Sequence, residues 1–243
     1  MILRITVAIV VCLLGCSPPS NNSEEVTKEK QATTSSEEWQ FLFNGDDLSG
    51  WEVLGGDANF YVEDGMIVGL TEKGLPNCFL ATQGEYDDFV LEVEFKIDSA
   101  INSGVQIRSA TYERDTTIAY INGKLEEGSR DWEAGRVYGY QVEIDPSERA
   151  WTGGFYEEGG RGWLVPLTGQ PKAQEAFRAG DWNRFKIRAE GNTFKTWIND
   201  VEAVQTTDEQ HSKGFIALQL HGAGREEQVG QKVYYRNIRI KEL

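Results

Sequence analysis

Three short segments of this chain carry polar side chains at every second position, and those side chains can bind and transform a ligand. The polar members are Gln106 and Arg108 in the first segment, Gln141, Glu143 and Asp145 in the second, and Gln219 and His221 in the third. A repeat of two residues is typical of a β-strand with one face in the core. If the three strands lie near each other in one sheet, we expect their polar face to form a floor for a hydroxyl-rich ligand.

Two carboxylates of the second segment have a spacing suited to acid–base chemistry. Glu143 and Asp145 project from the same face of a strand, roughly 6.5 to 7 Å apart from a rise of about 3.3 Å per residue. Glycosidases place two carboxyl groups on either side of the bond that they cleave. Glu148 adds a third acid in a Glu-x-Asp-x-x-Glu spacing, although Pro146 is expected to end the strand before it. A solvent-facing acidic strand end is the alternative interpretation.

The remaining titratable residues leave several roles open. His221 is one of two histidines, and it either acts as a base near neutral pH or caps the strand. Arg108 either stabilises a developing negative charge or pairs with Glu143. His221, Glu143 and Asp145 together could bind a divalent metal, but their spacing does not demand one. We therefore expect no cofactor.

Composition excludes several classes of partner. The chain has 243 residues and a net charge of −15, which argues against nucleic acid because nucleic-acid binding needs a basic surface. The same charge argues against long-range attraction of anionic polysaccharide. We expect a neutral oligosaccharide or a glycoside as the ligand.

The N-terminal residues predict a lipoprotein of the bacterial cell envelope. Arg4 and the short apolar run 5–14 are typical of a signal peptide spanning residues 1–15. The run ends in Leu-Leu-Gly-Cys, which resembles a lipobox with Cys16 as the lipidated residue. Residues 16–38 are polar and read as a flexible tether, so membrane contact is expected only through the lipid. An ordinary signal peptide that contains a cysteine is the alternative.

Residues 39–243 are predicted to form one all-β domain. Strands are expected at 60–62, 66–70, 90–97, 104–108, 138–144, 184–189, 194–198, 215–220 and 233–241, with one short helix at 171–178. Many short strands separated by turns indicate a β-sandwich or jelly roll. Two long connections, 110–136 and 146–181, are expected to be functional or mobile. Tyr156 and Trp163 in the second could cover a sugar ring or simply pack the loop onto the sheet.

Several motifs together resemble one protein family. They are the opening Phe-Leu-Phe-Asn-Gly-Asp-Asp-Leu-Ser-Gly-Trp at 41–51, Asn-Ser-Gly at 102–104, Asp-Trp-Asn at 181–183, the segment 216–221, and Tyr-Arg-Asn-Ile-Arg-Ile at 235–240. This pattern is similar to the 3-keto-disaccharide hydrolase family. Leu220 and the insertion 222–232 depart from the usual family pattern beside the expected cleft. The resemblance implies a concanavalin-A-like sandwich of two antiparallel sheets with a concave ligand face.

The resemblance also implies a substrate, a glycoside already oxidised to a ketone at C3. A base removes the acidified hydrogen at C2, the group at C1 leaves by β-elimination, and water completes net hydrolysis. His221 or Glu143 would be the base, Arg108 the oxyanion stabiliser, and Asp145 or Glu143 the proton donor. Substrate contacts would come from Asn102, Gln106, Gln141, Gln219, Tyr156 and Trp163. The alternatives are a lectin-like glycan-binding lipoprotein, a conventional two-carboxylate glycosidase, and a structural domain of the envelope.

Overall fold

A computed structural model describes residues 38–122 and 126–243. The expected signal peptide, the tether and Cys16 lie outside the described residues. Within the described ranges, no helix is long and apolar enough to cross a membrane.

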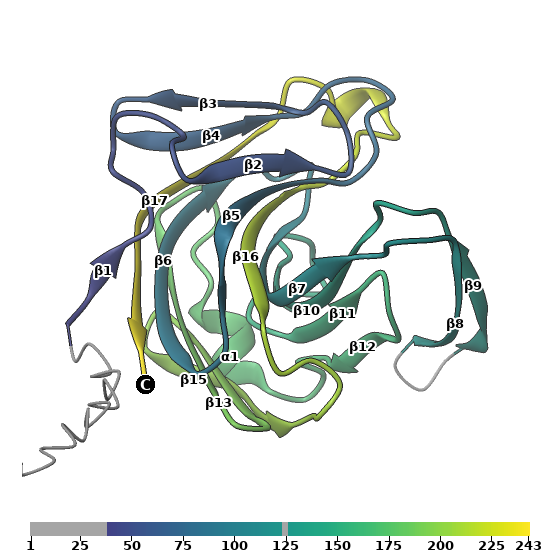
Figure 1. The fold of residues 1–243 in the computed structure, drawn as a ribbon. Helices are drawn as coiled ribbons and strands as arrows, with labels where there is room; N and C mark the ends of the chain where they lie inside the picture. The colour runs from purple at the N-terminus through teal and green to yellow at the C-terminus, as the bar shows by residue number, and fades with distance from the viewer. Residues whose placement is uncertain (1–37, 123–125) are drawn as a thin grey trace, which may run out of the picture. The chain divides into compact units, whose positions relative to one another are not determined.

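The described residues form seventeen strands and two short helices, and the strands make two large antiparallel sheets that pack face to face (Figure 1). The first sheet has the order β15 (Val201–Thr207), β14 (Thr193–Ile198), β13 (Asn183–Glu190), β6 (Phe89–Ile97), β17 (Lys232–Glu242), β4 (Met66–Leu70) and β3 (Asn59–Glu63), and β1 (Gln40–Phe41) also pairs with β17. The second has the order β12 (Gly162–Val165), β11 (Phe155–Glu158), β10 (Val137–Ile144), β7 (Ser103–Thr111), β16 (Gly214–Leu220), β5 (Cys78–Tyr86) and β2 (Trp51–Leu54). This arrangement confirms the predicted all-β sandwich.

The hydrophobic core lies between the sheets because each central strand buries its apolar alternate residues there. Val105, Ile107 and Val142 of the second sheet join the same buried cluster as Phe95 and Phe185 of the first. The polar alternates of β7, β10 and β16 therefore point away from the core, onto the outer face of the second sheet. This face is the predicted polar floor.

The long connections contain structure that the sequence did not reveal. The first holds a separate two-stranded hairpin of β8 (Thr116–Asn122) and β9 (Glu126–Trp132), which stands beside the second sheet at the right of Figure 1. The second holds β11 and β12, and a 3₁₀ turn, η1 (Glu226–Gln228), lies in the insertion before β17. The short helix predicted at 171–178 is confirmed as α1 (Pro171–Ala176). The strand β5 was not predicted either, since its first five residues are all buried and do not alternate.

A β-bulge in β7 breaks the alternation at Arg108. Tyr140 of β10 pairs with Ile107 while Tyr138 pairs with Ala110, so two residues of β7 face one residue of β10. Arg108 is the inserted residue, with a left-handed φ of 46°. Gly139 fills the opposing position, where a Cβ atom would lie 2.4 Å from Ser109 Oγ. The prediction that Gln106 and Arg108 share a face is therefore wrong, and Ser109 takes the place expected for Arg108.

Candidate active site

A pocket of about 360 Å³ opens on the outer face of the second sheet. Its walls are polar and aromatic side chains from five strands and the loops beside them. The lining residues are Asn77, Asn102, Arg130, Trp132, Arg136, Gln141, Glu143, Arg149, Tyr156, Glu158, Trp163, Gln219 and His221. Seven of the ten predicted catalytic and substrate-binding residues are among them. The contacts of the lining residues define two clusters of side chains.

The first cluster surrounds Glu143, whose side chain projects from β10 and is only 3% exposed. Asn102 Nδ2 donates a hydrogen bond to one carboxylate oxygen at 3.2 Å. Gln141 Nε2 donates to the other oxygen at 2.6 Å and lies 3.4 Å from Gln219 Oε1. Gly104, which pairs with Glu143, leaves room for this arrangement because a Cβ there would lie 2.4 Å from Gln141 Cδ.

A chain of donors behind Gln141 orients the amides toward the carboxylate. Ser109 Oγ donates to Gln106 Oε1 at 3.0 Å, and Gln106 Nε2 donates to Gln141 Oε1. Every hydrogen in this chain therefore points in the direction of Glu143. Hydrogen bonds in such a series polarise one another. The series therefore stabilises the ionised form of the Glu143 carboxylate.

Burial gives Glu143 the properties of a base that works near neutral pH. Removal from water raises the pKa of this carboxyl from 4.5 to about 7, and the hydrogen bonds from Asn102 and Gln141 oppose the rise. The charge of Asp145 raises the pKa further, whereas the charge of Arg149 lowers it. A general base is most effective when its pKa lies near the working pH.

Arg149 supplies the positive charge at this end of the pocket. Its Nη2 lies 4.0 Å from Glu143 Oε1, and its Nε donates to Asp145 Oδ2 at 2.8 Å. The guanidinium carbon lies 4.5 Å from the ring centre of Trp151 and 5.2 Å from that of Trp163. Two aromatic faces and one carboxylate thus hold the cation beside the base.

Aromatic rings border the same cluster. The rings of Tyr156 and Trp163 meet edge to face at 5.2 Å, and Trp163 meets Trp151 in the same way at 4.7 Å. Tyr156 pairs with Gln141 in the sheet, and Trp163 pairs with Tyr156. The cross-strand register therefore continues the amide floor directly into an aromatic wall, an arrangement suited to a sugar ring.

The second cluster surrounds Glu158, which is also buried. Arg136 Nη2 forms an ion pair with Glu158 Oε1, and the guanidinium carbon of Arg136 lies 4.6 Å from the ring centre of Trp132. Burial raises the pKa of Glu158, against the opposing charges of Arg136 and His221 and a hydrogen bond from Asn77. Trp132 comes from the last position of the β8–β9 hairpin, so this hairpin forms a wall of the pocket.

His221 follows the end of β16 and lines the pocket. Its Nδ1 lies 2.9 Å from the carbonyl oxygen of Gly222. A carbonyl only accepts, so Nδ1 must carry a hydrogen in this contact. Nε2 is therefore the ring nitrogen that is free to contact a ligand.

Asp145 is held outside the pocket lining. Its carboxylate accepts from the hydroxyl and backbone N–H of Ser147, from Arg149 Nε and from the N–H of Trp151. The strand pairing of β10 ends at Ile144, so Asp145 stabilises the turn that follows instead of extending the floor. Glu158, not Asp145, is the second carboxylate of the pocket.

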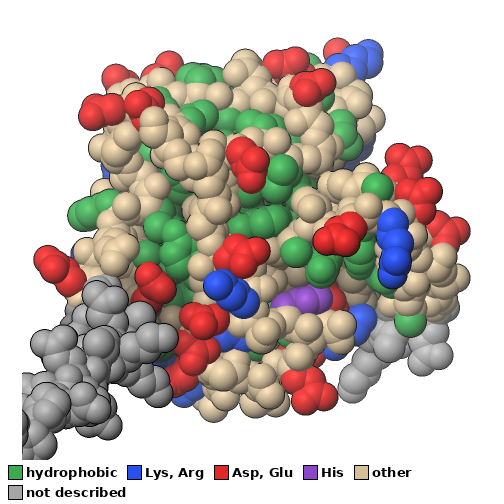
Figure 2. Space-filling model, viewed as in Figure 1, with side chains coloured by type: hydrophobic (Ala, Val, Ile, Leu, Met, Phe, Trp, Pro, Cys, Tyr) green, Lys and Arg blue, Asp and Glu red, His purple; other side chains and the backbone are tan. Residues whose placement is uncertain are grey.

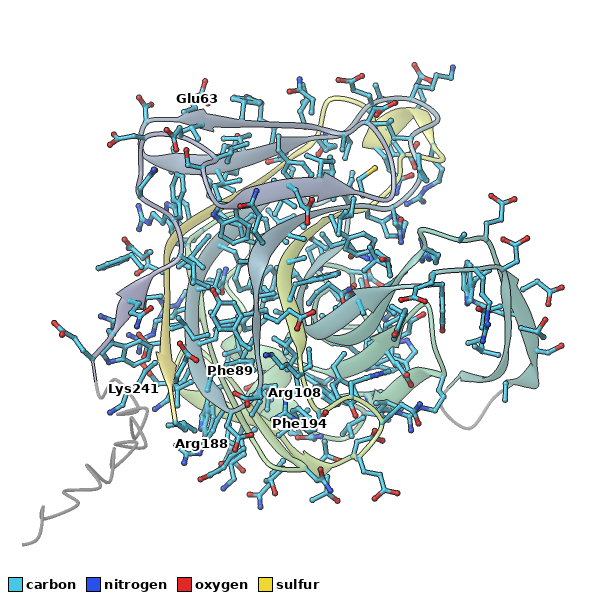
Figure 3. The ribbon with its side chains drawn as sticks, viewed as in Figure 1. Glu63, Phe89, Arg108, Arg188, Phe194 and Lys241 are labelled. Carbon is cyan, nitrogen blue, oxygen red and sulfur yellow. The ribbon has the colours of Figure 1, made fainter. Side chains whose placement is uncertain are left out.

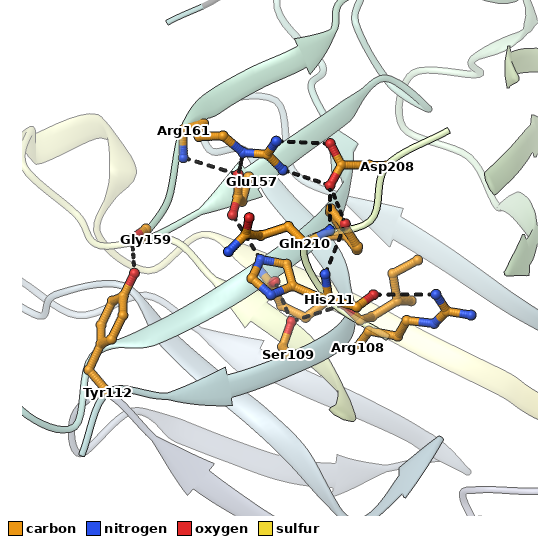
Figure 4. A network of polar contacts seen from close by, with 12 residues as sticks. Arg108, Ser109, Tyr112, Glu157, Gly159, Arg161, Asp208, Gln210 and His211 are labelled. Carbon is orange, nitrogen blue, oxygen red and sulfur yellow. Dashed lines mark hydrogen bonds and ion pairs between the residues drawn. The ribbon is translucent and has the colours of Figure 1, made fainter. Parts of the chain in front are cut away.

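Arg108 lies in a different network (Figure 4). Its guanidinium donates to the carbonyl oxygens of Asp87 and Gly191 at 2.7 and 2.8 Å and pairs with Asp88 at 2.9 Å. Its guanidinium carbon also lies 5.0 Å from the ring centre of Phe194 in the other sheet. The bulge turns this side chain away from the floor, so the expected pair with Glu143 does not form. Gln106 stays on the floor but is fully buried and does not line the pocket.

The pocket residues that sequence reasoning missed are Asn77, Arg130, Trp132, Arg136, Arg149 and Glu158. Most of them lie in, or directly next to, the two long connections, which were expected to be functional as segments. Only the register of β10 with β11, which places Glu158 opposite Gly139, identifies the carboxylate. No group of three or more metal-ligating side chains occurs among the residues that the structure describes.

Comparison with known proteins identifies the family. The model of the 3-keto-alpha-glucoside-1,2-lyase-like domain matches residues 38–241. Among solved structures, a candidate glycosyl hydrolase from Parabacteroides distasonis is 21% identical with a TM-score of 0.52, covering 84% of this chain and 94% of that one. The carbohydrate-binding module CBM66 from Bacillus subtilis is 15% identical with a TM-score of 0.50, covering 84% and 100%.

A further structure, a Bacillus subtilis protein with a galectin-like fold, is 11% identical with a TM-score of 0.52, covering 84% and 94%. At these identities the likeness establishes the fold and not the chemistry. None of the curated proteins matches the chain. The family match spans nearly the whole described sandwich, and the chain belongs to the family of 3-keto-alpha-glucoside-1,2-lyase-like domains.

Proposed function

We propose that this domain cleaves glycosides that carry a ketone at C3, with Glu143 as the base that removes the hydrogen at C2. The observation that supports this most strongly is the buried Glu143 carboxylate. It accepts hydrogen bonds from two amides, lies beside the Arg149 cation, and has a pKa of about 7. Removal of a hydrogen from a carbon next to a ketone needs a base of this kind.

The first step transfers one proton and creates one negative charge. Glu143 takes the hydrogen from C2, and the electron pair of that bond spreads over C2, C3 and the ketone oxygen as an enolate. Arg149, 4.0 Å from the base, offers its positive charge to that oxygen. Fixed charges of this kind act where charge develops in the transition state.

The second step breaks the bond from C1 to the glycosidic oxygen. The enolate electrons restore the C3 carbonyl and form a C1–C2 double bond, and the departing oxygen takes a proton. We assign that proton to His221, acting from Nε2, because His221 lines the pocket and its charge acts on Glu158 of the second cluster. Water then adds to C1 and gives one proton to His221, while Glu143 returns its proton to C2. Both side chains thereby regain their starting protonation states, and the net reaction is hydrolysis.

The two clusters suggest how a substrate is divided between them. Tyr156 and Trp163 would cover the oxidised ring above the amides of Gln141 and Gln219. The Glu158 cluster, with Arg136 and Trp132, would receive the leaving group. Because the leaving group would contact Glu158 and Arg136, we expect the substrate to be a glycoside with a polar leaving group.

Incubating the protein with a 3-keto-glucoside and with its unoxidised parent tests the function. Release of the leaving group from the keto compound alone is the expected result. Release from the parent would support a conventional glycosidase, for which Glu143 and Glu158 are the available carboxylates. Binding of either compound without release would indicate a lectin-like module.

Replacement of Arg149 tests the assignment of the cation. We expect the Arg149→Met variant to lose about 100-fold or more in kcat, as for other residues that stabilise a developing oxyanion. Because Arg149 lowers the pKa of Glu143, the rising limb of the pH profile should also move to higher pH. Arg149→Lys should recover part of both effects. Arg178→Met, at an exposed position outside the pocket, is the control, and an unshifted pH profile for Arg149→Met would contradict the assignment.

A further inference from the structure

The outer face of the first sheet carries a second hollow, on the opposite side of the sandwich from the candidate active site. Its volume is about 500 Å³. The lining residues are Trp39, Val90, Lys186, Arg188, Glu190, Thr193, Lys195, Trp197 and Lys241. We call this hollow the basic groove, since it contains four cationic side chains and one acidic one.

Three of the four cations of the basic groove lie in one row across the sheet. Lys195 of β14 pairs with Arg188 of β13, Arg188 pairs with Val90 of β6, and Val90 pairs with Lys241 of β17. Figure 3 labels Arg188 and Lys241, which lie close to the end of β17. Like charges directly opposite each other destabilise a sheet, so this row is unfavourable for folding on its own.

Few local contacts neutralise the row. Arg188 pairs with Glu190 at 2.7 Å, and the Lys186 ammonium lies 5.4 Å from the ring centre of Trp197. The side chains of Lys195 and Lys241 form no hydrogen bond or ion pair with any other residue that the structure describes. In a chain with a net charge of −15, whose acidic side chains are spread over the visible face in Figure 2, two unpaired lysines in one groove indicate an anionic partner.

The groove also lies where the N-terminal segment enters the domain. Trp39, one of its lining residues, directly precedes β1, and its ring centre lies 4.6 Å from the guanidinium carbon of Arg239. Residues 16–38, with the expected lipid attachment at Cys16, come immediately before Trp39 in the sequence. A membrane reached through that lipid would therefore be within the range of a short tether from this groove.

We propose that the basic groove is a membrane-facing surface that binds the headgroups of anionic lipids. Lysine is a point charge on a flexible stem and suits mobile headgroups, and tryptophan favours the membrane–water interface. Juxtamembrane basic residues are attracted to anionic lipid in the same way. The acidic remainder of the surface is repelled by such a membrane. The domain is thereby oriented with its active-site pocket away from the bilayer.

Vesicle binding tests this proposal. The probe is the full chain with Cys16→Ser, so that no lipid is attached, sedimented with vesicles of phosphatidylethanolamine with or without phosphatidylglycerol. We expect the Lys195→Glu, Lys241→Glu double variant to bind the anionic vesicles about 25-fold more weakly or worse, from roughly a fivefold contribution per basic residue. High salt should abolish the difference between the two proteins.

A matched variant controls for net charge. Lys172→Glu, Lys213→Glu changes the charge equally at two exposed positions outside the groove, and it should bind like the parent. The N-terminal apolar run is present in every protein, so its contribution cancels. Equal binding by both double variants would overturn the proposal. The proposal would also be overturned if the Lys195→Glu, Lys241→Glu variant lost binding to a soluble acidic polysaccharide but bound vesicles like the parent. That result would assign the groove to a glycan.

Discussion

Replacing Glu143 by Gln should lower kcat on a 3-keto-glucoside by about 1,000-fold while leaving binding nearly unchanged, because general bases typically contribute 10²–10⁴-fold. The amide is close in shape to the carboxylate. The oxygen of the new amide can still accept from Gln141 Nε2. The Asn102 side chain contacts Glu143 once, so its amide can rotate and accept a hydrogen bond from the new NH₂ group. Turnover and binding, measured separately by product release and by calorimetry, check this result.

The neighbouring acid Glu148 provides a matched control. Glu148 is exposed in the turn after β10, and Glu148→Gln should retain full activity. Equal losses of binding and turnover in Glu143→Gln would show that Glu143 only holds the ligand. Full activity in that variant would exclude it as the base.

The pH dependence follows from the same carboxyl. Only the ionised form of Glu143 takes a proton, and its pKa is about 7. The limb of the parent's kcat/KM profile that Glu143 controls should therefore rise about tenfold per pH unit below 7. The folded protein also buries a charge above pH 7 that the unfolded chain, with a carboxyl near 4.5, keeps in water. The stability of Glu143→Gln relative to the parent should therefore increase between pH 5 and pH 8. The unfolding curves that measure this difference also show whether the variant is folded.

Alternation of residue types was sufficient to predict the floor of the pocket. It placed Gln141, Glu143 and Gln219 on one face, because apolar residues between them must lie in the core. The same rule failed at Arg108 because a bulge adds one residue to a strand and reverses every later position. No residue type in that segment marks the bulge, although Gly139 on the partner strand accommodates it.

The walls of the pocket could not be predicted in the same way. Arg149, Glu158 and Trp132 reach it from a turn, a short strand and a hairpin, and their positions depend on which strands pair. Pairing is a property of the tertiary fold, and a single sequence does not encode it locally. Asp145 is an example. Strand spacing predicted that it lies beside Glu143 on the floor, but its carboxylate accepts hydrogen bonds from the turn that begins at Pro146.

Removal of the Arg108 side chain should destabilise the protein without impairing catalysis. Arg108 is 2% exposed, and its guanidinium donates to three backbone carbonyls and to Asp88. Arg108→Met leaves those acceptors without a donor, which should cost about 3 kcal/mol. For a domain of this size, that corresponds to a fall of about 6–12 °C in Tm. Urea unfolding and kcat/KM on the same preparation measure the two effects.

An exposed arginine separates this burial effect from loss of charge alone. Arg184 pairs with Asp200 at the surface, and Arg184→Met should change stability by less than about 1 kcal/mol. The folded fraction of Arg108→Met should keep kcat within about twofold of the parent, since the bulge directs Arg108 toward Phe194 and away from Glu143. A loss of kcat comparable to that of Glu143→Gln, with stability unchanged, would instead return Arg108 to the active site. Loss of stability with kcat unchanged would show that the bulge moves Arg108 from the floor of the pocket to a contact between the two sheets.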